Sequence, residues 1–527
     1  MKREIILRLS PKEASDEQFF KPLVAKKMNV APESITAMRV VKRSIDARKK
    51  IIVVQLHVEA WANVMPPKPS KVAFEYPDVS KAPSVIIVGA GPGGYFAALR
   101  LIELGLKPVV LERGKGVNER KKDLALLNRN EGVNVESNYA YGEGGAGTFS
   151  DGKLYTRSTK RGDFKKVLEV FHFHGASEEI LIDAHPHIGT DKLPDVIKSM
   201  RQSVENAGGE VHFNTKVTNL ILEEQKIRGV ETETGDKILA QSVILATGHS
   251  ARDIYYMLDA NKVALEAKTW AMGVRVEHPQ EHIDQIQYHS QKGRGEYLPA
   301  ASYSLSCQIE ERGVYSFCMC PGGFIVPAMT NADEMVVNGM SPSKRNSPWA
   351  NSGMVVEVRP EDIGEFQNKG VLGGLEYQKE LERLAFVNGG RGVVAPAQSL
   401  ADFVDGKLSF ELGDCSYVPG LVASPIHFWL PENIGQRLRK GFEYFDKRAR
   451  GFVTNEALVV GVESRTSSPV RIPRDRTSFQ HVQIEGLYPC GEGAGYAGGI
   501  ASSAIDGERC GEKVYEFITG KSLEEKK

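Results

Sequence analysis

Apolar and polar residues alternate near the N-terminus in a pattern that predicts a small α+β domain. Residues 4–9 follow the two-residue period of a strand, and residues 16–28 carry apolar side chains at helical spacing. Two more strand-like runs, at 36–44 and 51–61, flank a polar turn and predict a hairpin. We expect these elements to form one unit, with a ferredoxin-like arrangement as one option.

The next apolar run, at residues 84–88, is unbroken and rich in β-branched side chains, as in a strand buried on both faces. It ends in a G-x-G-x-x-G turn, helix-forming residues 96–101 follow at once, and a second apolar run at 108–111 stops at an acid. This order predicts a βαβ unit that binds the ADP part of a dinucleotide. The residues expected at this site are Gly89, Ala90, Gly91, Pro92, Gly93, Gly94, Glu112 and Arg113.

Each position in this unit has a physical reason. Gly89 permits the tight turn, Gly91 lets the backbone approach the pyrophosphate, and Gly94 lets the helix pack closely on the strand. The phosphates are expected at the helix N-terminus, and Glu112 is expected to bind the ribose hydroxyls. An ordinary glycine-rich turn is the alternative, but it leaves the terminal acid unexplained.

Later segments favour FAD over NAD as the dinucleotide. A strand near residues 211–217 can offer backbone amides to an adenine, and the apolar run at 242–248 ends in a small-residue turn. A glycine-rich loop at 142–150 can present several amides to the pyrophosphate or the flavin, with a plain surface turn as the alternative. The residues expected to contact the cofactor here are Gly144, Gly145, Ala146, Gly147, Thr148, Val217, Ala246, Thr247 and Gly248.

Near the C-terminus, Gly491 and Glu492 precede a final helix at about 499–518, and with this segment the chain resembles the glutathione-reductase-fold FAD oxidoreductases. In that class an acid in a G-[DE] pair hydrogen-bonds the ribityl chain, and the next helix directs its N-terminus at the flavin pyrimidine ring. The resemblance implies the first role for Glu492. It implies the second for the helix start at Gly498, Gly499, Ile500 and Ala501. A helix N-terminus carries roughly half a positive charge, which stabilises the anionic reduced flavin.

More narrowly, the chain resembles a bacterial family of FAD-dependent dehydrogenases. The resemblance rests on four unusual strings, at residues 142–148, 185–191, 317–323 and 463–471. It implies an α/β fold with non-covalently bound FAD in a Rossmann-like domain of the glutathione-reductase type. A mixed α+β substrate domain and the small N-terminal domain complete the expected architecture. It does not identify the substrate.

These patterns give the expected domain boundaries. Residues 1–80 form the small basic domain with its linker, carrying 15 Lys and Arg against 9 Asp and Glu. The FAD-binding domain is expected in three parts, at 81–160, 191–269 and 455–527. The substrate domain is expected at 270–454, with an additional segment at 161–190.

Four side chains are candidates for catalysis. Cys318 and Cys320 stand two apart in a strand-like run, so both thiols can point to one face. A C-x-C disulfide closes a small strained ring, and strained disulfides are labile; two structural thiols are nevertheless the favoured interpretation. His187 is weighed as an acid or base against a role in shaping its loop. Arg465, like Arg471, is weighed as a ligand of the flavin or a substrate carboxylate against structural pairing.

Composition narrows the class of protein further. The 527 residues contain 67 Lys and Arg and 67 Asp and Glu, so no overall charge indicates a nucleic-acid or membrane partner. Six cysteines in a chain of this length favour a reducing compartment, and we expect a cytoplasmic protein without a metal site. No apolar stretch approaches the roughly 20 residues that span a bilayer. A small-molecule substrate is the expected partner, and the oligomeric state is not predicted.

The predicted function is hydride transfer between flavin N5 and an organic substrate. There is no second strand with a G-x-G-x-x-G turn, so NAD(P)H would have to bind transiently, or the substrate itself would supply the hydride. Two alternatives stay open. One is a flavin monooxygenase of the hydroxybenzoate-hydroxylase type, and the other is an RNA-binding flavoprotein that uses residues 1–62.

Overall fold

A five-stranded parallel sheet lies at the centre of the Rossmann-like part of the protein. The computed structural model describes residues 1–68, 73–155 and 162–523. The expected domain boundary between residues 160 and 161 lies outside the described residues.

The strand order of the parallel sheet is β22-β10-β4-β5-β6, which confirms the predicted α/β fold. The strands are β4 (Ser84–Val88), β5 (Lys107–Leu111), β6 (Glu210–His212), β10 (Val243–Leu245) and β22 (Leu487–Pro489). Because they are parallel, their carboxyl ends meet at one edge.

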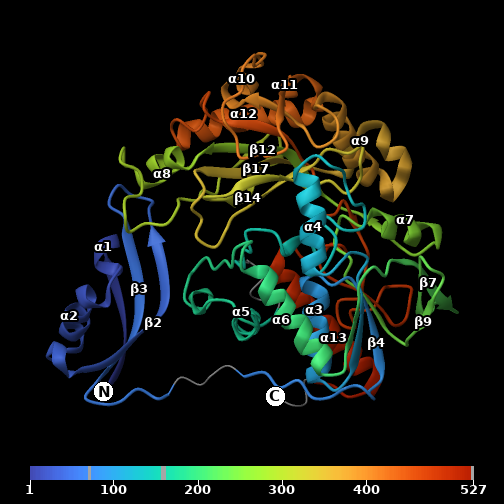
Figure 1. The fold of residues 1–527 in the computed structure, drawn as a ribbon, viewed down its shortest axis with the longest axis horizontal. Coiled ribbons are helices and arrows are strands. Elements are labelled where there is room, and N and C mark those ends of the chain that lie inside the picture. The colour runs from blue at the N-terminus through green and yellow to red at the C-terminus, as the bar shows by residue number, and fades with distance from the viewer. Residues whose placement is uncertain (69–72, 156–161, 524–527) are drawn as a thin grey trace.

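Helices cover one face of this sheet, with α3, α6 and α13 side by side in Figure 1. Their bounds are α3 (Pro92–Glu103), α5 (Phe164–Phe173), α6 (Leu193–Asn206) and α13 (Ile500–Thr519). Together with the sheet they enclose one apolar cluster. Helices α3 and α13 approach each other closely, since a Cβ on Gly507 would lie 2.0 Å from the carbonyl oxygen of Gly93. Only a glycine at position 507 allows the two helices this separation.

The other face of the parallel sheet carries a small antiparallel sheet, β7 (Val217–Glu223), β8 (Lys226–Thr232) and β9 (Lys237–Leu239). The prediction of a single strand near residues 211–217 is wrong, because two strands share this segment. It is divided between β6 and β7, which belong to different sheets. The chain turns between them at Asn214, whose φ of 52° is left-handed. Helices α4 (Val117–Asn128) and α7 (Arg252–Ala260) complete this half of the molecule.

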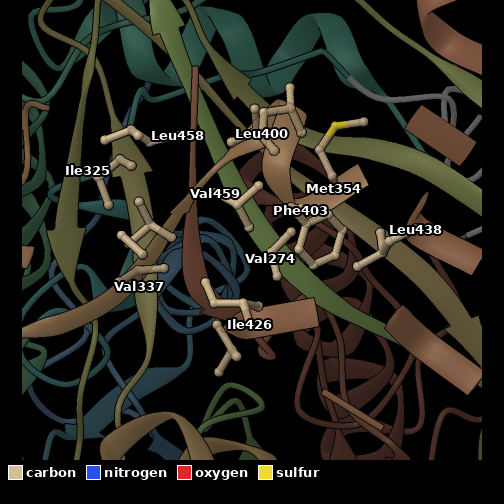
Figure 2. Packing of buried hydrophobic residues seen from close by; sticks show 14 of the residues in the cluster. Val274, Ile325, Val337, Met354, Leu400, Phe403, Ile426, Leu438, Leu458 and Val459 are labelled. Atoms are coloured by element: carbon tan, nitrogen blue, oxygen red, sulfur yellow. The ribbon is translucent and has the colours of Figure 1, made fainter. Parts of the chain in front are cut away.

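A seven-stranded mixed sheet forms the second half, with strand order β13-β14-β17-β12-β20-β18-β19. Its strands are β12 (Trp270–Pro279), β13 (Ser306–Ile309), β14 (Arg312–Cys320), β17 (Trp349–Val358), β18 (Ala395–Ser399), β19 (Leu421–Ala423) and β20 (Leu458–Glu463). The helices around it are α8 (Gln280–Tyr288), α9 (Gly373–Asn388), α10 (Leu400–Asp405), α11 (Ile426–Trp429) and α12 (Glu432–Arg448). Figure 2 shows Val274 and Met354 of the sheet beside Phe403 of α10 and Leu438 of α12, within the largest apolar cluster.

Two short pairs of strands complete the sheets: β11 (Glu266–Ala267) with β21 (Val470–Arg471), and β15 (Phe324–Pro327) with β16 (Val337–Met340). Ile325 and Val337 from the second pair join the same apolar cluster beside Leu458 (Figure 2). The second half of the molecule is thus one continuous core.

The N-terminal unit contains β1 (Lys2–Leu9), α1 (Pro11–Ala14), α2 (Glu17–Met28), β2 (Ile35–Asp46) and β3 (Val53–Ala62). Its described strands form an antiparallel sheet in the order β1-β3-β2, one strand short of the four in a ferredoxin-like fold. The unit has its own apolar core. It contacts the remainder through β2, where Arg43 pairs with Asp183 at 2.7 Å and accepts a backbone hydrogen bond from Ala184.

We predict that Gly507→Ala lowers the free energy of unfolding while Gly511→Ala in the same helix does not. Both changes improve helix propensity, but overpacking at position 507 costs about 1–3 kcal/mol. The nearest atom to a Cβ on Gly511 is the Ala97 carbonyl oxygen, at 3.3 Å, which a small shift accommodates. Urea unfolding of both variants measures the difference; equal stability would show that the α3–α13 separation is not constrained by Gly507.

Candidate functional site

A cavity of about 360 Å³ lies where the carboxyl edge of the parallel sheet faces the seven-stranded sheet. It joins glycine-rich segments that are far apart in the sequence. Of the residues expected to bind a cofactor, those that line it are Gly89, Gly91, Pro92, Gly93, Glu112, Arg113, Gly145, Ala146, Gly147, Val217, Ala246, Thr247, Gly248, Gly491, Glu492, Gly498, Gly499 and Ile500. Because one hollow joins all these segments, it is the candidate site for an extended nucleotide.

The first turn is confined to glycine by its neighbours. Gly89 has φ +104°, and a Cβ there would lie 2.4 Å from the carbonyl oxygen of Ala246. A Cβ on Gly94 would lie 2.0 Å from the carbonyl oxygen of Gly89, so the α3 start can pack tightly on β4. Gly91 caps α3 without a side-chain hydrogen bond. The first amides of α3 are therefore left for an anionic group in the cavity.

Glu112 ties three loops together. Its buried carboxylate accepts hydrogen bonds from the backbone N–H groups of Ala90, Gly114 and Gly142, each at 2.9 Å. These amides belong to the turn after β4, the turn after β5 and the start of the 142–148 loop. The carboxylate also lines the cavity, where it can accept hydroxyl groups. The ribose role expected from the sequence is thus joined to a second role, which is to fix the loops relative to one another.

Five residues expected to contact the cofactor do not line the cavity and instead support its wall. They are Ala90, Gly94, Gly144, Thr148 and Ala501. The Gly144 amide donates to the Ala90 carbonyl at 2.8 Å, and the buried Thr148 hydroxyl donates to the Glu143 carbonyl at 2.7 Å. Loop 144–147 therefore packs against the first turn, where a Cβ on Gly145 would be 3.2 Å from Gly91 Cα.

The opposite end of the cavity is walled by glycines with free space above them. A Cβ on Gly248, Gly498 or Gly499 would meet no atom within 4 Å, so side chains there would occupy the cavity itself. Helix α13 begins beside these residues, and its cap residue Gly499 has no side chain to cap it. Glu492 lies with its carboxylate 3.3 Å from His249 Nδ1. This end offers uncapped amides, an acid and room for a flat ring.

The side of the cavity toward the seven-stranded sheet holds groups that the sequence did not single out. Asp151, Lys153 and Asn338 line it together with Phe317 and Cys318. Burial would raise the pKa of Asp151, but Lys153 and Arg345 lower it to about 2. Its carboxylate lies 2.6 Å from Arg345 and 3.6 Å from Lys153. The sequence offered one indication of this role, because residues 151–153 directly follow the glycine-rich loop expected to bind the cofactor.

Arg465 lines the cavity, and its guanidinium belongs to a buried ion network. It bonds Glu382 at 2.8 Å, Thr330 at 2.8 Å and Glu334 at 3.4 Å. Arg252 bonds both of the same carboxylates. Burial would raise the pKa of Glu382, but the two arginines lower it to about 2. These contacts favour the structural pairing that the sequence left as the alternative to a carboxylate ligand.

His187 does not line the cavity, which corrects its place among the catalytic candidates. Its Nε2 is 3.1 Å from the Ser343 carbonyl oxygen, and burial lowers its pKa. This contact fits the alternative expected from the sequence for His187, in which the side chain shapes its loop. Cys318 lines the cavity, whereas Cys320 is fully buried behind it.

One group in the described part of the chain brings three possible metal ligands within 4.8 Å: Cys490, Asp506 and Cys510. The Asp506 carboxylate is already bonded by Arg474 at 2.5 Å and by the Gly491 amide at 2.8 Å. A guanidinium at that distance opposes a second cation, so we assign these residues to supporting the start of the Gly491 loop.

Comparisons with known proteins agree with this geometry. Residues 269–466 match the family described as "FAD-dependent protein, C-terminal domain-like", residues 193–293 match "Glucose inhibited division protein A", and residues 1–61 match a domain of unknown function. An uncharacterized protein of Clostridium beijerinckii is 40% identical over 513 residues, covering 94% of this chain and 95% of the relative.

Solved structures are similar at a lower level. A flavoprotein/dehydrogenase from Cytophaga hutchinsonii has 12% identity and a TM-score of 0.36, over 84% of this chain and 80% of the other. The L-proline dehydrogenase from P. horikoshii has 13% identity and a TM-score of 0.32, over 85% and 95%. Within the residues that the structure describes, no helix combines the length and apolar character needed to cross a membrane.

We predict that Arg465→Met destabilises the protein by about 3–5 kcal/mol at neutral pH, because two buried carboxylates then share one arginine. Arg471→Met is the matched control: its pair with Glu266 is 3.6 Å long and exposed, and such pairs contribute at most about 1 kcal/mol. Chemical unfolding of both variants measures the difference.

The same comparison has a predicted pH dependence. The lowered pKa of Glu382 stabilises the folded protein above the ordinary value of 4.5, and this contribution is lost as pH falls toward 2. The difference in free energy of unfolding between the unaltered protein and Arg465→Met should therefore become smaller as the pH falls from 5 to 2. A difference that stays constant across this range would contradict the assignment of Glu382 as its ionised partner.

Proposed function

We propose that this chain, which belongs to the FAD-dependent dehydrogenase family, holds one FAD non-covalently in the cavity and uses it to oxidise or reduce a small organic substrate. The observation that carries the proposal is the single hollow that joins two uncapped helix N-termini with the glycine walls between them. Bound FAD would supply the redox chemistry by exchanging a hydride at its N5 atom.

We assign the ADP half of the cofactor to the end of the cavity near β4 and β5. The uncapped start of α3 and the amides of loop 145–147 face the same space, which suits a diphosphate. Glu112 lies where a ribose would follow, and Val217 lines the adenine end. The supporting residues behind this wall keep the amides pointing inward.

We assign the flavin half to the end of the cavity near α13. The Gly498 and Gly499 wall leaves room for a planar ring, and the uncapped α13 start places partial positive charge beside it. Glu492, with His249 beside it, lies where the ribityl chain would pass.

The substrate would then bind on the side of the cavity formed by the seven-stranded sheet. Lys153 offers a cation, Asn338 offers an amide and Phe317 offers an apolar surface. NAD(P)H, if it acts as reductant, would have to enter by this same side, because a second dinucleotide motif is missing from the sequence. Substrate and nicotinamide would therefore compete for one space.

We predict that Glu112→Ala raises the Kd for FAD at least tenfold, because losing a charged acceptor leaves buried donors unpaired at a cost of roughly 1–3 kcal/mol. Glu119→Ala, an exposed acid in the following helix, is the control. Titration of FAD into each apo variant measures the Kd, and unfolding without FAD separates cofactor binding from stability. Equal Kd values for the two variants would contradict the assignment.

The proposed function is tested by reducing the purified protein with light under anaerobic conditions and adding a panel of organic acceptors. We expect at least one acceptor to restore the oxidised flavin spectrum rapidly. Reoxidation only by oxygen, with substrate-stimulated NAD(P)H consumption, would instead indicate a monooxygenase. A colourless protein that stays colourless after incubation with FAD would exclude both.

A further inference from the structure

Two thiols lie together on the substrate side of the cavity. Cys318 and Cys320 end β14, where the Cys318 side chain is partly exposed to the cavity and Cys320 is buried behind it. The Cys320 thiol donates to the Cys318 carbonyl oxygen at 3.2 Å, and both sulfurs lie within 4.0 Å of Lys153 Nζ. One thiol is therefore accessible from the cavity, and the other is buried two residues further along the strand.

The backbone around these thiols is irregular in a way that brings them together. The pairing of β14 with β17 shifts between Phe317 and Cys320, which marks a β-bulge. Cys318 occupies the bulge with φ +46°, a left-handed conformation that is strained for a residue with a Cβ. Bulges beside functional sites commonly redirect a side chain. Here the redirected side chain is the thiol that faces the cavity.

Two cations face the thiol pair from different elements. Lys153 Nζ lies 4.0 Å from Cys318 Sγ and 3.7 Å from Cys320 Sγ. Arg275 of β12 places Nη2 3.7 Å from Cys320 Sγ and donates to the Cys318 carbonyl oxygen at 2.9 Å. The acids nearby, Asp151 and Glu463, are themselves paired with Lys153 and Arg275.

This environment favours one thiolate, on Cys318. Side-chain hydrogen bonding with Cys320, together with the charges of Lys153 and Arg275, lowers the pKa of Cys318 well below its ordinary value, although burial opposes the shift. The same hydrogen bond and burial raise the pKa of Cys320. Burial raises the pKa of Glu463 to about 7, although Arg275 opposes the shift. Thiolates are the reactive form of cysteine, and positive surroundings are where reactive cysteines occur.

We propose that Cys318 and Cys320 form a redox couple that closes reversibly into a disulfide and exchanges electrons with FAD in the same cavity. This inference rests on the proposed function for its electron acceptor. Starting from the Cys318 thiolate and the Cys320 thiol, closing the S–S bond breaks one S–H bond and releases two electrons and one proton. Oxidised FAD would accept both electrons and that proton, which gives the anionic reduced flavin. Cys318 is accessible from the cavity, so it is the sulfur that would attack an entering disulfide. Cys320 would then attack the resulting mixed disulfide and close the bond with Cys318.

The short spacing suits a reversible couple. A disulfide across a single intervening residue closes a small ring, and strained disulfides are reduced more readily than structural ones. The proposal also identifies the substrate class, since a couple of this kind exchanges with small thiols and disulfides that enter the cavity. Two inert structural thiols, the interpretation favoured from sequence, would need neither the accessible position nor the two cations.

The test uses the full-length protein with its bound FAD, equilibrated anaerobically in buffers of reduced and oxidised glutathione. After acid quenching, denaturation and alkylation, mass spectrometry of peptides gives the state of each cysteine. We expect Cys318 and Cys320 to switch together, with a loss of two hydrogens, while Cys307 and Cys415 stay alkylated. A peptide that stays fully alkylated in every buffer, or a disulfide between Cys490 and Cys510 alone, would overturn the proposal.

A second measurement addresses Lys153, which acts on the thiols by position. Native protein is treated with iodoacetamide over a range of pH, and the alkylation rate of Cys318 is compared with that of Cys307. We expect Lys153→Met to slow alkylation of Cys318 about tenfold at pH 7 and to move its pH profile upward, with Lys153→Arg restoring both. Equal rates for Cys318 and Cys307 in the unaltered protein would contradict a reactive thiolate.

The two proposals fail separately. A Cys318→Ser, Cys320→Ser double variant that remains yellow, together with unaltered protein whose thiols never exchange, would sink the redox couple and leave FAD binding intact. Thiols that exchange in a protein that cannot bind added FAD would overturn the cofactor assignment and the electron transfer to FAD, and would leave only the reversible disulfide. Because peptide analysis reads the cysteines directly, neither result depends on measuring enzymatic turnover.

Discussion

One buried carboxylate organises the end of the cavity near β4 and β5. Glu112 accepts three backbone N–H groups, and each belongs to a different loop at the edge of the parallel sheet. A buried charge is tolerated only when such donors surround it, so the carboxylate and the loops require each other. The glycines at 89 and 94 then follow as geometric necessities, because any side chain there would overlap the backbone that this arrangement brings close.

The second half of the molecule completes the cavity and introduces its charged groups. The seven-stranded sheet supplies Cys318 to the wall, and the Lys153 segment joins it from the glycine-rich loop. Buried ions behind this wall occur as pairs: Arg275 bonds Glu463 at 2.6 Å, and Arg465 shares Glu382 with Arg252. Pairing keeps these charges from destabilising the core, and it leaves a defined electrostatic environment facing the cavity. The end of the cavity near β4 and β5 is thus formed largely by backbone groups, whereas the side toward the seven-stranded sheet is formed largely by side chains.

The sequence predicted the parts of this site that depend on local patterns. A strand, glycine turn, helix and terminal acid are adjacent along the chain, so their geometry follows from sequence spacing alone. The partners of Arg465 were not predictable in this way, because Glu334 and Glu382 are far away in sequence and meet it only through the fold. The same holds for Lys153 beside the two cysteines. The left-handed backbone of Cys318 was also not predictable, because mainly glycine and asparagine favour that conformation and a cysteine gives no sign of it. Asn214 is one such asparagine: its left-handed backbone turns the chain between β6 and β7, and it was not used to end the predicted strand there.

Hydrogen–deuterium exchange with and without FAD tests most directly whether the distant loops bind a single FAD at the same time. Addition of FAD should slow amide exchange in residues 89–94, 142–148 and 491–501 together, with one midpoint of protection as the FAD concentration rises. Protection of the first segment alone, or different midpoints for the three segments, would contradict the account.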